Sequence, residues 1–257
     1  MAEEEIAQAH EIRDCAIMKL DVKIFGDKAK SMQQLYPDTK VLVFCKEPWK
    51  VLGMSAAAVN ENLLYVLAKW REEYVIVAEK RLGELQMRTG HKFKKLLAFN
   101  GDALDELVLA HPFTSKDLPV LVDNEVAAYH GTGIDCVAPA HEMHSLKVAY
   151  HYDLSKEGCV DDQGKFTEEA GLIFAGLSVF DEGTNELVTK MLQEEDALLC
   201  QYPFKNEFYE DVETGEKIIL RSSKSWFLQI SEQLKSRCFD ELSTTLFCPK
   251  LNIKDAE

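Results

Sequence analysis

His141 and His144 have types and a spacing that could support metal binding or catalysis. Cys136, a few positions earlier, could form a Cys–His pair with either of them. Two histidines three positions apart on a helix can ligate a metal ion when a third ligand comes from elsewhere in the fold. The zinc-protease motif spaces its histidines four positions apart, however, and the local sequence fixes no third group to orient a Cys–His pair. The residues therefore favour two surface histidines and a buried structural cysteine. A metal- or thiol-dependent hydrolase stays open as the alternative.

A glycine-containing segment just before the histidines is typical of a ligand pocket wall. Gly131 and Gly133 flank Thr132, and glycine lets the backbone adopt a positive φ and approach a ligand closely. Pro139, between two alanines, prevents a regular helix at that point. A third glycine and a preceding βαβ unit are both missing, so this is not a dinucleotide fingerprint. We expect no cofactor and no metal.

The net charge, the cysteine spacing and the N-terminal composition limit which partners and which cellular compartment the sequence predicts. The 257 residues carry a formal net charge of −15, which argues against general electrostatic binding of nucleic acid and leaves only local RNA contacts. Seven cysteines are scattered without a CxxC pair, as expected for reduced thiols without zinc or disulfides. The first residues are acidic, unlike a secretory signal or transit peptide, and no apolar run approaches about 18 residues. The sequence thus predicts no membrane contact and a location in the cytoplasm or mitochondrial matrix.

The elements that must position these residues are predicted to be mainly short strands with peripheral helices. Regular spacing of apolar runs and turn residues favours a barrel or sandwich, followed by an amphipathic helix with Thr184 as its N-cap. We expect a helical or frayed lead-in over residues 1–14, strands at 15–25, 40–45 and 217–230, and helices over 182–200 and 231–243. Within 63–90 we expect two strands and a helix ending at Gly90, and turns at 100–102 and 123–124. The predicted divisions of one domain are 1–39 (lead-in strand and linker), 40–183 (barrel) and 184–257 (helix, return strand and C-terminal helix).

Several motifs, in this order, resemble the inserted editing domain of isoleucyl-tRNA synthetases, most closely the mitochondrial and bacterial type. They lie at residues 45–60, 74–85, 110–113, 118–141, 160–171 and 217–227, and the resemblance runs from about residue 2 to about residue 250. The resemblance implies a β-barrel with peripheral helices (α+β), inserted in a synthetic core, that hydrolyses valine wrongly esterified to tRNA(Ile). Such a second site is needed because a hydrophobic pocket discriminates one methylene by only about 1–3 kcal/mol.

The resemblance also implies which residues should act, and this chain departs from the pattern at those positions. The family's strand reads Thr-Thr-x-Pro-Trp-Thr, whereas this chain has Cys45, Lys46, Glu47, Pro48, Trp49 and Lys50. Cys136 stands where the family has a histidine that blocks the larger amino acid. Ser145 stands where a family aspartate holds the α-ammonium, and a one-residue slip would place His144 there instead. An uncharged hydroxyl cannot replace that charge-assisted contact.

The resemblance therefore predicts an editing-like domain whose deacylase activity is weak or lost. We expect one cleft lined or supported by Pro48, Trp49, Gly131, Thr132, Gly133, Cys136, Pro139, His141 and His144. The implied partners are the 3′ end of tRNA and a parent synthetase core. The chain lacks the His-x-Gly-His signature and a Lys-Met-Ser-Lys-Ser loop, so it cannot itself activate an amino acid. The alternatives are a new chemistry built on Lys46 and Glu47, or a free-standing non-catalytic module that binds tRNA or a synthetase.

Overall fold

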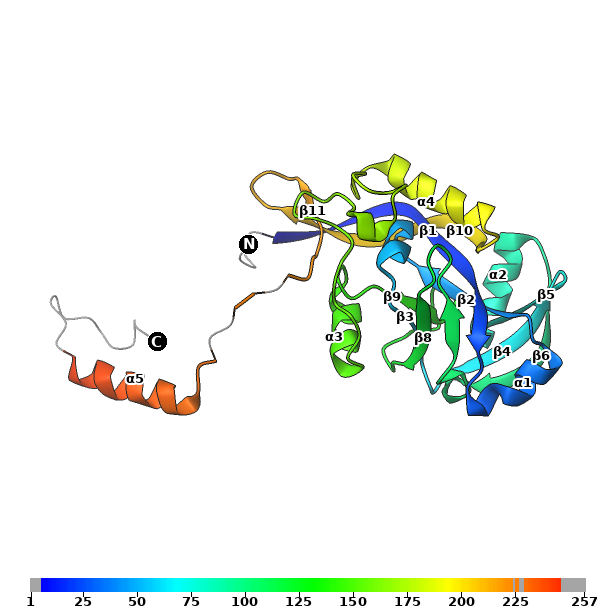
Figure 1. Ribbon diagram of the computed structural model, residues 1–257, viewed down its shortest axis with the longest axis horizontal. Coiled ribbons are helices and arrows are strands. Elements are labelled where there is room, and N and C mark those ends of the chain that lie inside the picture. The colour runs from blue at the N-terminus through cyan, green and yellow to red at the C-terminus, as the bar shows by residue number, and fades with distance from the viewer. Residues whose placement is uncertain (1–5, 224, 227–228, 246–257) are drawn as a thin grey trace. The chain divides into compact units, whose positions relative to one another are not determined.

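A computed structural model describes residues 6–223, 225–226 and 229–245 of the chain. These residues belong to two compact units, residues 1–222 and residues 223–257 (Figure 1). The described residues of the second unit include the helix α5 (Glu232–Thr244), whose N-cap Ser231 accepts a hydrogen bond from the Leu234 amide. This confirms the helix predicted over 231–243. Within the described part of the chain, no helix is long and apolar enough to cross a membrane.

Six strands of the first unit close into a mixed barrel. Its order is β1-β7-β8-β3-β9-β2, and β1 also pairs with β2, which closes the ring. The β3–β8 and β2–β9 pairs are parallel, and the others are antiparallel. The barrel strands are β1 (Ile6–Ile24), β2 (Thr39–Cys45), β3 (Ala56–Val59), β7 (Val108–Ala110), β8 (Asp117–Val122) and β9 (Ile134–Val137). This confirms the predicted barrel.

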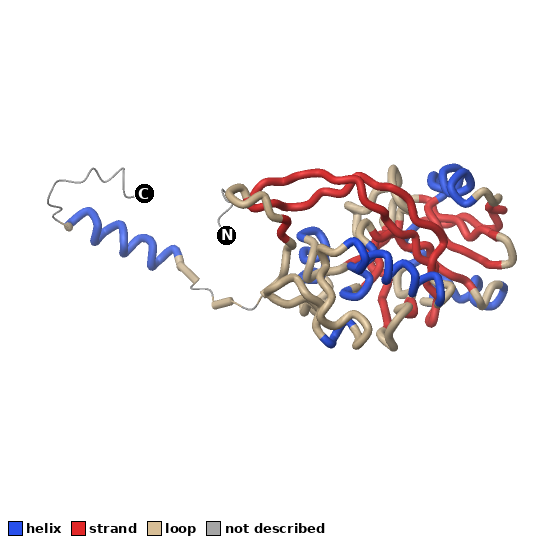
Figure 2. Tube along the Cα trace, turned by 90° about the horizontal axis from the view of Figure 1, so that it is seen from above, coloured by secondary structure: helices blue, strands red, loops and turns tan. Residues whose placement is uncertain are grey.

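Further strands extend the sheet on both sides of the barrel. From β2 it continues through β5 (Glu73–Ala78) and β4 (Leu64–Trp70) to β6 (Phe93–Asn100). From β1 it continues through β10 (Leu198–Asp211) to β11 (Lys217–Ile218). Figure 2 shows β1 and β10 running on together beyond the barrel, and we call this extension the β1–β10 arm.

Short helices cover the sheet at several places. Val188 and Leu192 of α4 (Glu182–Glu194) are fully buried in the main core, and Figure 1 shows this helix beside β10. Val148 of α3 (Met143–His151) packs on the outer face of β3 and β9. The remaining helices are α1 (Lys30–Leu35), α2 (Leu82–Thr89) and the 3-10 turns Asp27–Ala29, Pro48–Gly53, Glu79–Arg81, Gly101–Leu104 and Glu168–Ala170.

Local signals predicted several elements correctly. The strand over 40–45 is β2, and the two strands and the helix expected within 63–90 are β4, β5 and α2. Gly90 caps α2 in the left-handed conformation, at φ +68°, as a helix-ending glycine should.

The structure corrects other expectations. Residues 6–14 are not a helical lead-in, because their backbone pairs with β10 from Ile6 to Asp14. The helix expected over 182–200 ends at Glu194, and β10 begins at Leu198. Asp181 is the N-cap of α4, since its carboxylate accepts from the Gly183 amide at 3.0 Å, whereas Thr184 lies inside the helix and donates to the Ser178 carbonyl.

One expected turn and one expected strand also differ from the structure. The turn at 100–102 does not join a hairpin, because β6 pairs with β4 while β7 pairs with β1 and β8. Of the strand expected over 217–230, only β11 forms, and residues 224, 227 and 228 lie outside the described part. Gly101 itself packs against another segment, since an added Cβ there would lie 2.1 Å from the Asn60 carbonyl oxygen.

Candidate functional site

Residues 45–50 and 131–145 lie against each other at one end of the barrel. Phe44 of β2 pairs with Asp135 of β9, and parallel strands bring their carboxyl ends to the same edge of the sheet. The Cys45 thiol donates to the Glu47 carbonyl at 3.1 Å, and its interaction with the Cys136 thiol raises the pKa of Cys136. The rings of Trp49 and His141 meet edge to face with centroids 5.1 Å apart. The two segments that the sequence singled out are therefore in contact.

The glycine segment approaches its own chain closely. Gly131 and Gly133 have φ values of +58° and +74°, and an added Cβ would lie 2.4 Å from Cγ of Phe44 or 2.5 Å from Cβ of Ala78. Thr132 is fully buried, and its hydroxyl donates to the Ile134 carbonyl at 2.9 Å. These three residues serve the packing of the strands.

Beside this segment lies a cavity of about 190 Å³, which we call the cleft. It opens between the end of β2, strand β9, the segment 123–130 and the first turn of α3. Cys136, His144, Ser145, Cys45, Lys46 and Lys50 all line it, together with Phe44, Ala58, Asp123, Glu125, Val126, Ala127, Tyr129, His130, Asp135, Val137 and Glu142.

Ion pairs and hydrogen bonds occupy most polar groups of the cleft. Lys46, directly after β2, reaches across to Glu142 at 3.4 Å, and the Ser145 hydroxyl donates to the same carboxylate at 2.7 Å. Burial opposes ionisation of Glu142, but Lys50 and Lys46 outweigh it and hold its pKa below the ordinary value. His144 lies between two carboxylates, with Nε2 2.5 Å from Asp123 and Nδ1 3.0 Å from Glu125.

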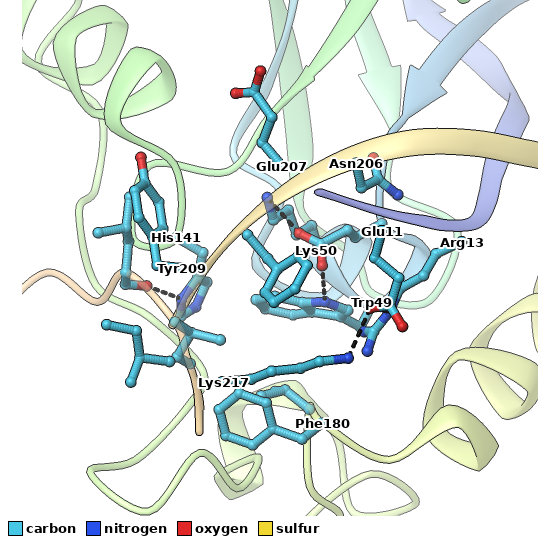
Figure 3. A pocket seen from close by; sticks show the side chains of 16 residues that line it. Glu11, Arg13, Trp49, Lys50, His141, Phe180, Asn206, Glu207, Tyr209 and Lys217 are labelled. Atoms are coloured by element: carbon cyan, nitrogen blue, oxygen red, sulfur yellow. Dashed lines mark hydrogen bonds and ion pairs between the residues drawn. The ribbon is translucent and has the colours of Figure 1, made fainter. Parts of the chain in front are cut away.

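A second, smaller cavity of about 60 Å³ lies on the other side of Lys50, under the β1–β10 arm (Figure 3). Trp49 and His141 line it, and Lys50 is paired with Glu47 at 2.7 Å. The Trp49 indole N–H donates to Glu47 at 3.3 Å, and His141 Nδ1 donates to the Leu220 carbonyl at 3.2 Å. The expected single cleft is thus divided in two by the Lys50–Glu47 pair. Two other expected lining residues lie elsewhere, since Pro48 faces a groove beside α4 and Pro139 is buried.

The buried His141 should make the fold sensitive to acid. Burial lowers the pKa of His141 to about 4, while the unfolded chain binds that proton near 6.5. The unfolded state then holds more protons between these values, so stability is full above about pH 6.5 and is lost as the pH falls toward about 4. The shift corresponds to about 3 kcal/mol of unfolding free energy.

Between about pH 7 and pH 4.5, we expect the unfolding free energy of His141→Gln to fall by about 2 kcal/mol less than that of the parent chain, as measured by urea denaturation. His10→Gln is the matched control, because the His10 side chain is 44% exposed on the β1–β10 arm. Equal acid sensitivity of the parent chain and His141→Gln would contradict the prediction.

The residues of the cleft that sequence reasoning missed include the two carboxylates Asp135 and Glu142. The available signal for Asp135 was a carboxylate inside the otherwise apolar strand Ile134–Val137, which also fits an ordinary solvent-facing position. The Asp135 Oδ1 atom is instead buried without a hydrogen-bond partner. Burial raises the pKa of Asp135 to about 7.

Most of this chain aligns in sequence with known isoleucine–tRNA ligases. No family model matches it. An isoleucine–tRNA ligase of Acaryochloris marina is 31% identical over 218 residues, which are 85% of this chain and 22% of the ligase. The chloroplastic/mitochondrial isoleucine–tRNA ligase of Arabidopsis thaliana is 28% identical over 260 residues, which cover 91% of this chain and 23% of that protein.

Solved structures share the fold. The cytosolic leucyl-tRNA synthetase editing domain of P. falciparum superposes with a TM-score of 0.57 at 13% identity, over 74% of this chain and 99% of that domain. The corresponding domain of P. knowlesi gives a TM-score of 0.54 at 13% identity, over 76% of this chain and 97% of that domain. The chain is homologous to the editing domain of isoleucyl-tRNA synthetases. This editing-domain homologue spans 22% of the length of the Acaryochloris ligase.

Proposed function

We propose that this editing-domain homologue keeps the amino-acid cleft of its family but hydrolyses Val-tRNA(Ile) little faster than the uncatalysed background. One observation carries the proposal. Ser145 stands at the position of the family's ammonium-binding aspartate, and its hydroxyl donates a hydrogen bond to the Glu142 carboxylate at 2.7 Å. Deacylation needs a positioned water, donors for the developing oxyanion and an anchor that fixes the ester. Ser145 supplies no charge for that anchor.

The strand that should position the water supports the same conclusion. Among the described residues that line the cleft there is no threonine, and β2 and the following turn contribute Phe44, Cys45, Lys46 and Lys50. Lys46 and Lys50 are held by Glu142 and Glu47, so both ammonium groups are directed at carboxylates of this chain. Donors committed to internal ion pairs are poorly placed to stabilise a developing oxyanion, because they would first have to leave those partners.

The geometry disfavours a metal- or thiol-dependent hydrolase. His141 and His144 line different cavities, and within the described ranges no group of three or more His, Cys, Asp or Glu side chains could hold a metal. A hydrogen bond with the Cys45 thiol, together with burial, holds the pKa of Cys136 well above its ordinary value. Because the thiolate is the nucleophile, a thiol kept protonated is inert.

The alternative is a non-catalytic module that contacts tRNA or a synthetase core, and the same internally paired cleft is compatible with it. The net charge of −15 favours a protein partner over free tRNA, since phosphate contacts need clustered Lys and Arg. Any binding of free tRNA should then be weak and salt-sensitive.

The test is a deacylation assay with valine-charged tRNA(Ile), in which we expect the rate with the chain to stay within a few-fold of the rate without protein. Glu47→Ala and His144→Ala should leave this rate unchanged, as should Met143→Ala, an exposed neighbour on α3. Robust turnover that Glu47→Ala or His144→Ala abolishes and Met143→Ala preserves would overturn the proposal and establish a replacement chemistry.

A further inference from the structure

Cys45 and Cys136 form a pair of thiols that the proposed function leaves unused. Phe44 of β2 pairs with Asp135 of β9 in a parallel ladder, so the next residues on the two strands, Cys45 and Cys136, lie side by side. Both pack in the main core cluster, and both line the cleft. The two side chains therefore project from the same face of the sheet and meet at the wall of the cleft.

The spacing of the two strands suits a covalent bond between these thiols. Neighbouring strands lie about 4.7–4.9 Å apart, and a disulfide joins residues whose Cα atoms are about 4.4–6.8 Å apart. The thiols also interact directly, since Cys45 is the largest influence on the pKa of Cys136. Both are free in this structure. A bond between them requires rotation of the side chains and little movement of the backbone.

The second close pair of cysteines in the described part of the chain has a less favourable geometry. On β1 and β10, Cys15 stands opposite Tyr202 and Cys200 stands opposite Ile17, so the two cysteines are diagonal neighbours. Diagonal neighbours on paired strands lie about 7–8 Å apart, beyond the usual span of a disulfide. Cys15 and Cys200 therefore serve as an internal comparison for Cys45 and Cys136.

Access from solvent differs between the two thiols of the cleft. Cys136 is partly exposed, whereas Cys45 is 2% exposed and its thiol donates to the Glu47 carbonyl at 3.1 Å. The cleft has a volume of about 190 Å³, and a molecule the size of water needs only about 10–15 Å³. A small oxidant can thus reach Cys136 first, and Cys45 is placed to react with the oxidised sulfur.

We propose that Cys45 and Cys136 are a site of reversible oxidation, at which a small peroxide converts the two thiols into a disulfide between β2 and β9. The Cys136 thiolate attacks one oxygen of hydrogen peroxide and the O–O bond breaks. The departing hydroxide takes up the proton released by Cys136, which leaves one water and a sulfenic acid. The Cys45 thiolate then attacks the Cys136 sulfur, the S–O bond breaks, and this hydroxide takes up the Cys45 proton to form a second water. Peroxide accepts the two electrons, and a thiol reductant reverses the change.

Oxidation should be slow at neutral pH and should accelerate as the pH rises. The neighbouring Cys45 thiol and burial hold the pKa of Cys136 well above its ordinary value, the Glu142 carboxylate at the start of α3 adds to the shift, and Lys50 opposes it. Only the thiolate attacks the oxidant, and its fraction rises about tenfold per pH unit below the pKa. The raised pKa that disfavours rapid catalysis by this thiol therefore slows a single oxidation event without preventing it.

The experiment treats the full chain with hydrogen peroxide and maps its cysteines by mass spectrometry. We expect a linked Cys45–Cys136 peptide that forms about tenfold faster at about pH 8 than at pH 7 and disappears on reduction with dithiothreitol. Because the new bond closes a long loop of the chain, the melting temperature should rise by about 5 °C or more and should return to its starting value on reduction.

In Cys45→Ser, Cys136 should stop at the sulfenic acid, which dimedone traps, or proceed to the sulfinic acid, because no second thiol is at hand. Cys200→Ser is the matched control, since Cys200 is also partly exposed, and it should form the linked peptide at the rate of the parent chain.

Three results with the parent chain would overturn the inference even if Cys45→Ser failed to fold. The first is conversion of Cys136 to the sulfinic acid without a linked peptide. The second is a Cys136 that peroxide leaves unmodified at about pH 9. The third is a linked peptide that forms equally fast at about pH 7 and pH 8, which would exclude attack by the Cys136 thiolate. None of these results depends on deacylation, so the proposed loss of activity is tested separately.

Discussion

Restoring the family residues around the cleft is expected to raise the deacylation of Val-tRNA(Ile) by at least about 100-fold over the parent chain. The variant carries the family's Thr at 45, 46 and 50, His at 136 and Asp at 145. It also carries Thr at 47, where the family pattern leaves the residue open, and Gly at 142. One oxyanion-type donor is typically worth about 100- to 1000-fold in rate, and the ammonium anchor is restored in addition. The effects of residues that act together are not additive, so the expected gain is set at the value of a single donor.

Glycine at 142 is required by the structure. The Ser145 hydroxyl lies 2.7 Å from the Glu142 carboxylate, so an aspartate at 145 would place two carboxylates side by side. Two neighbouring carboxylates disfavour ionisation of one of them, and the anchor would lose its charge. The matched control is the same variant with Glu142 retained, which should recover much less activity. Equal activity of the two variants, or a folded seven-residue variant with background activity, would contradict this account of the cleft.

Gly131→Ala is expected to destabilise the barrel by about 2–5 kcal/mol, measured as the free energy of unfolding in urea. A residue with a side chain at φ +58° costs about 1–2 kcal/mol. The added methyl would also lie 2.4 Å from Cγ of Phe44, in a part of the core that is already filled, and overpacking of this kind costs about 1–3 kcal/mol.

Gly90→Ala separates these two effects. Gly90 has a similar φ of +68°, but an added Cβ would meet no atom within 4 Å. Its substitution should therefore cost only the backbone contribution, about 1–2 kcal/mol. If both variants lost the same stability, the close approach of Gly131 to Phe44 would not be the reason for a glycine at that position.

Short-range patterns in the sequence determined much of the fold. The apolar runs at 40–45 and 63–78, the helix ended by Gly90 and the helix capped by Ser231 all follow from contacts between residues near one another in the chain. The ordered motifs added the family and, with it, the barrel. They also identified the positions where this chain departs from the family pattern, because those departures are residue identities that need no coordinates.

Pairings between distant segments decided the rest. Residues 6–14 form a strand only because β10, almost two hundred positions later, supplies the partner backbone. The glycines of the 131–133 segment proved to face Phe44 and Ala78, and the Lys50–Glu47 pair divided the expected cleft in two. None of these contacts leaves a periodic trace in the sequence.

The same limit applies to the electrostatics of the cleft. Asp135 is an ordinary acidic residue by type, and only enclosure by β2, β9 and α3 leaves its Oδ1 without a partner and raises its pKa to about 7. Glu142 and Ser145 likewise meet because Glu142 is the N-cap of α3 and Ser145 lies in the first turn of that helix. Residue types fixed which groups could act, and the tertiary structure decided which of them are already occupied, because burial and pairing arise only when the chain has closed around them.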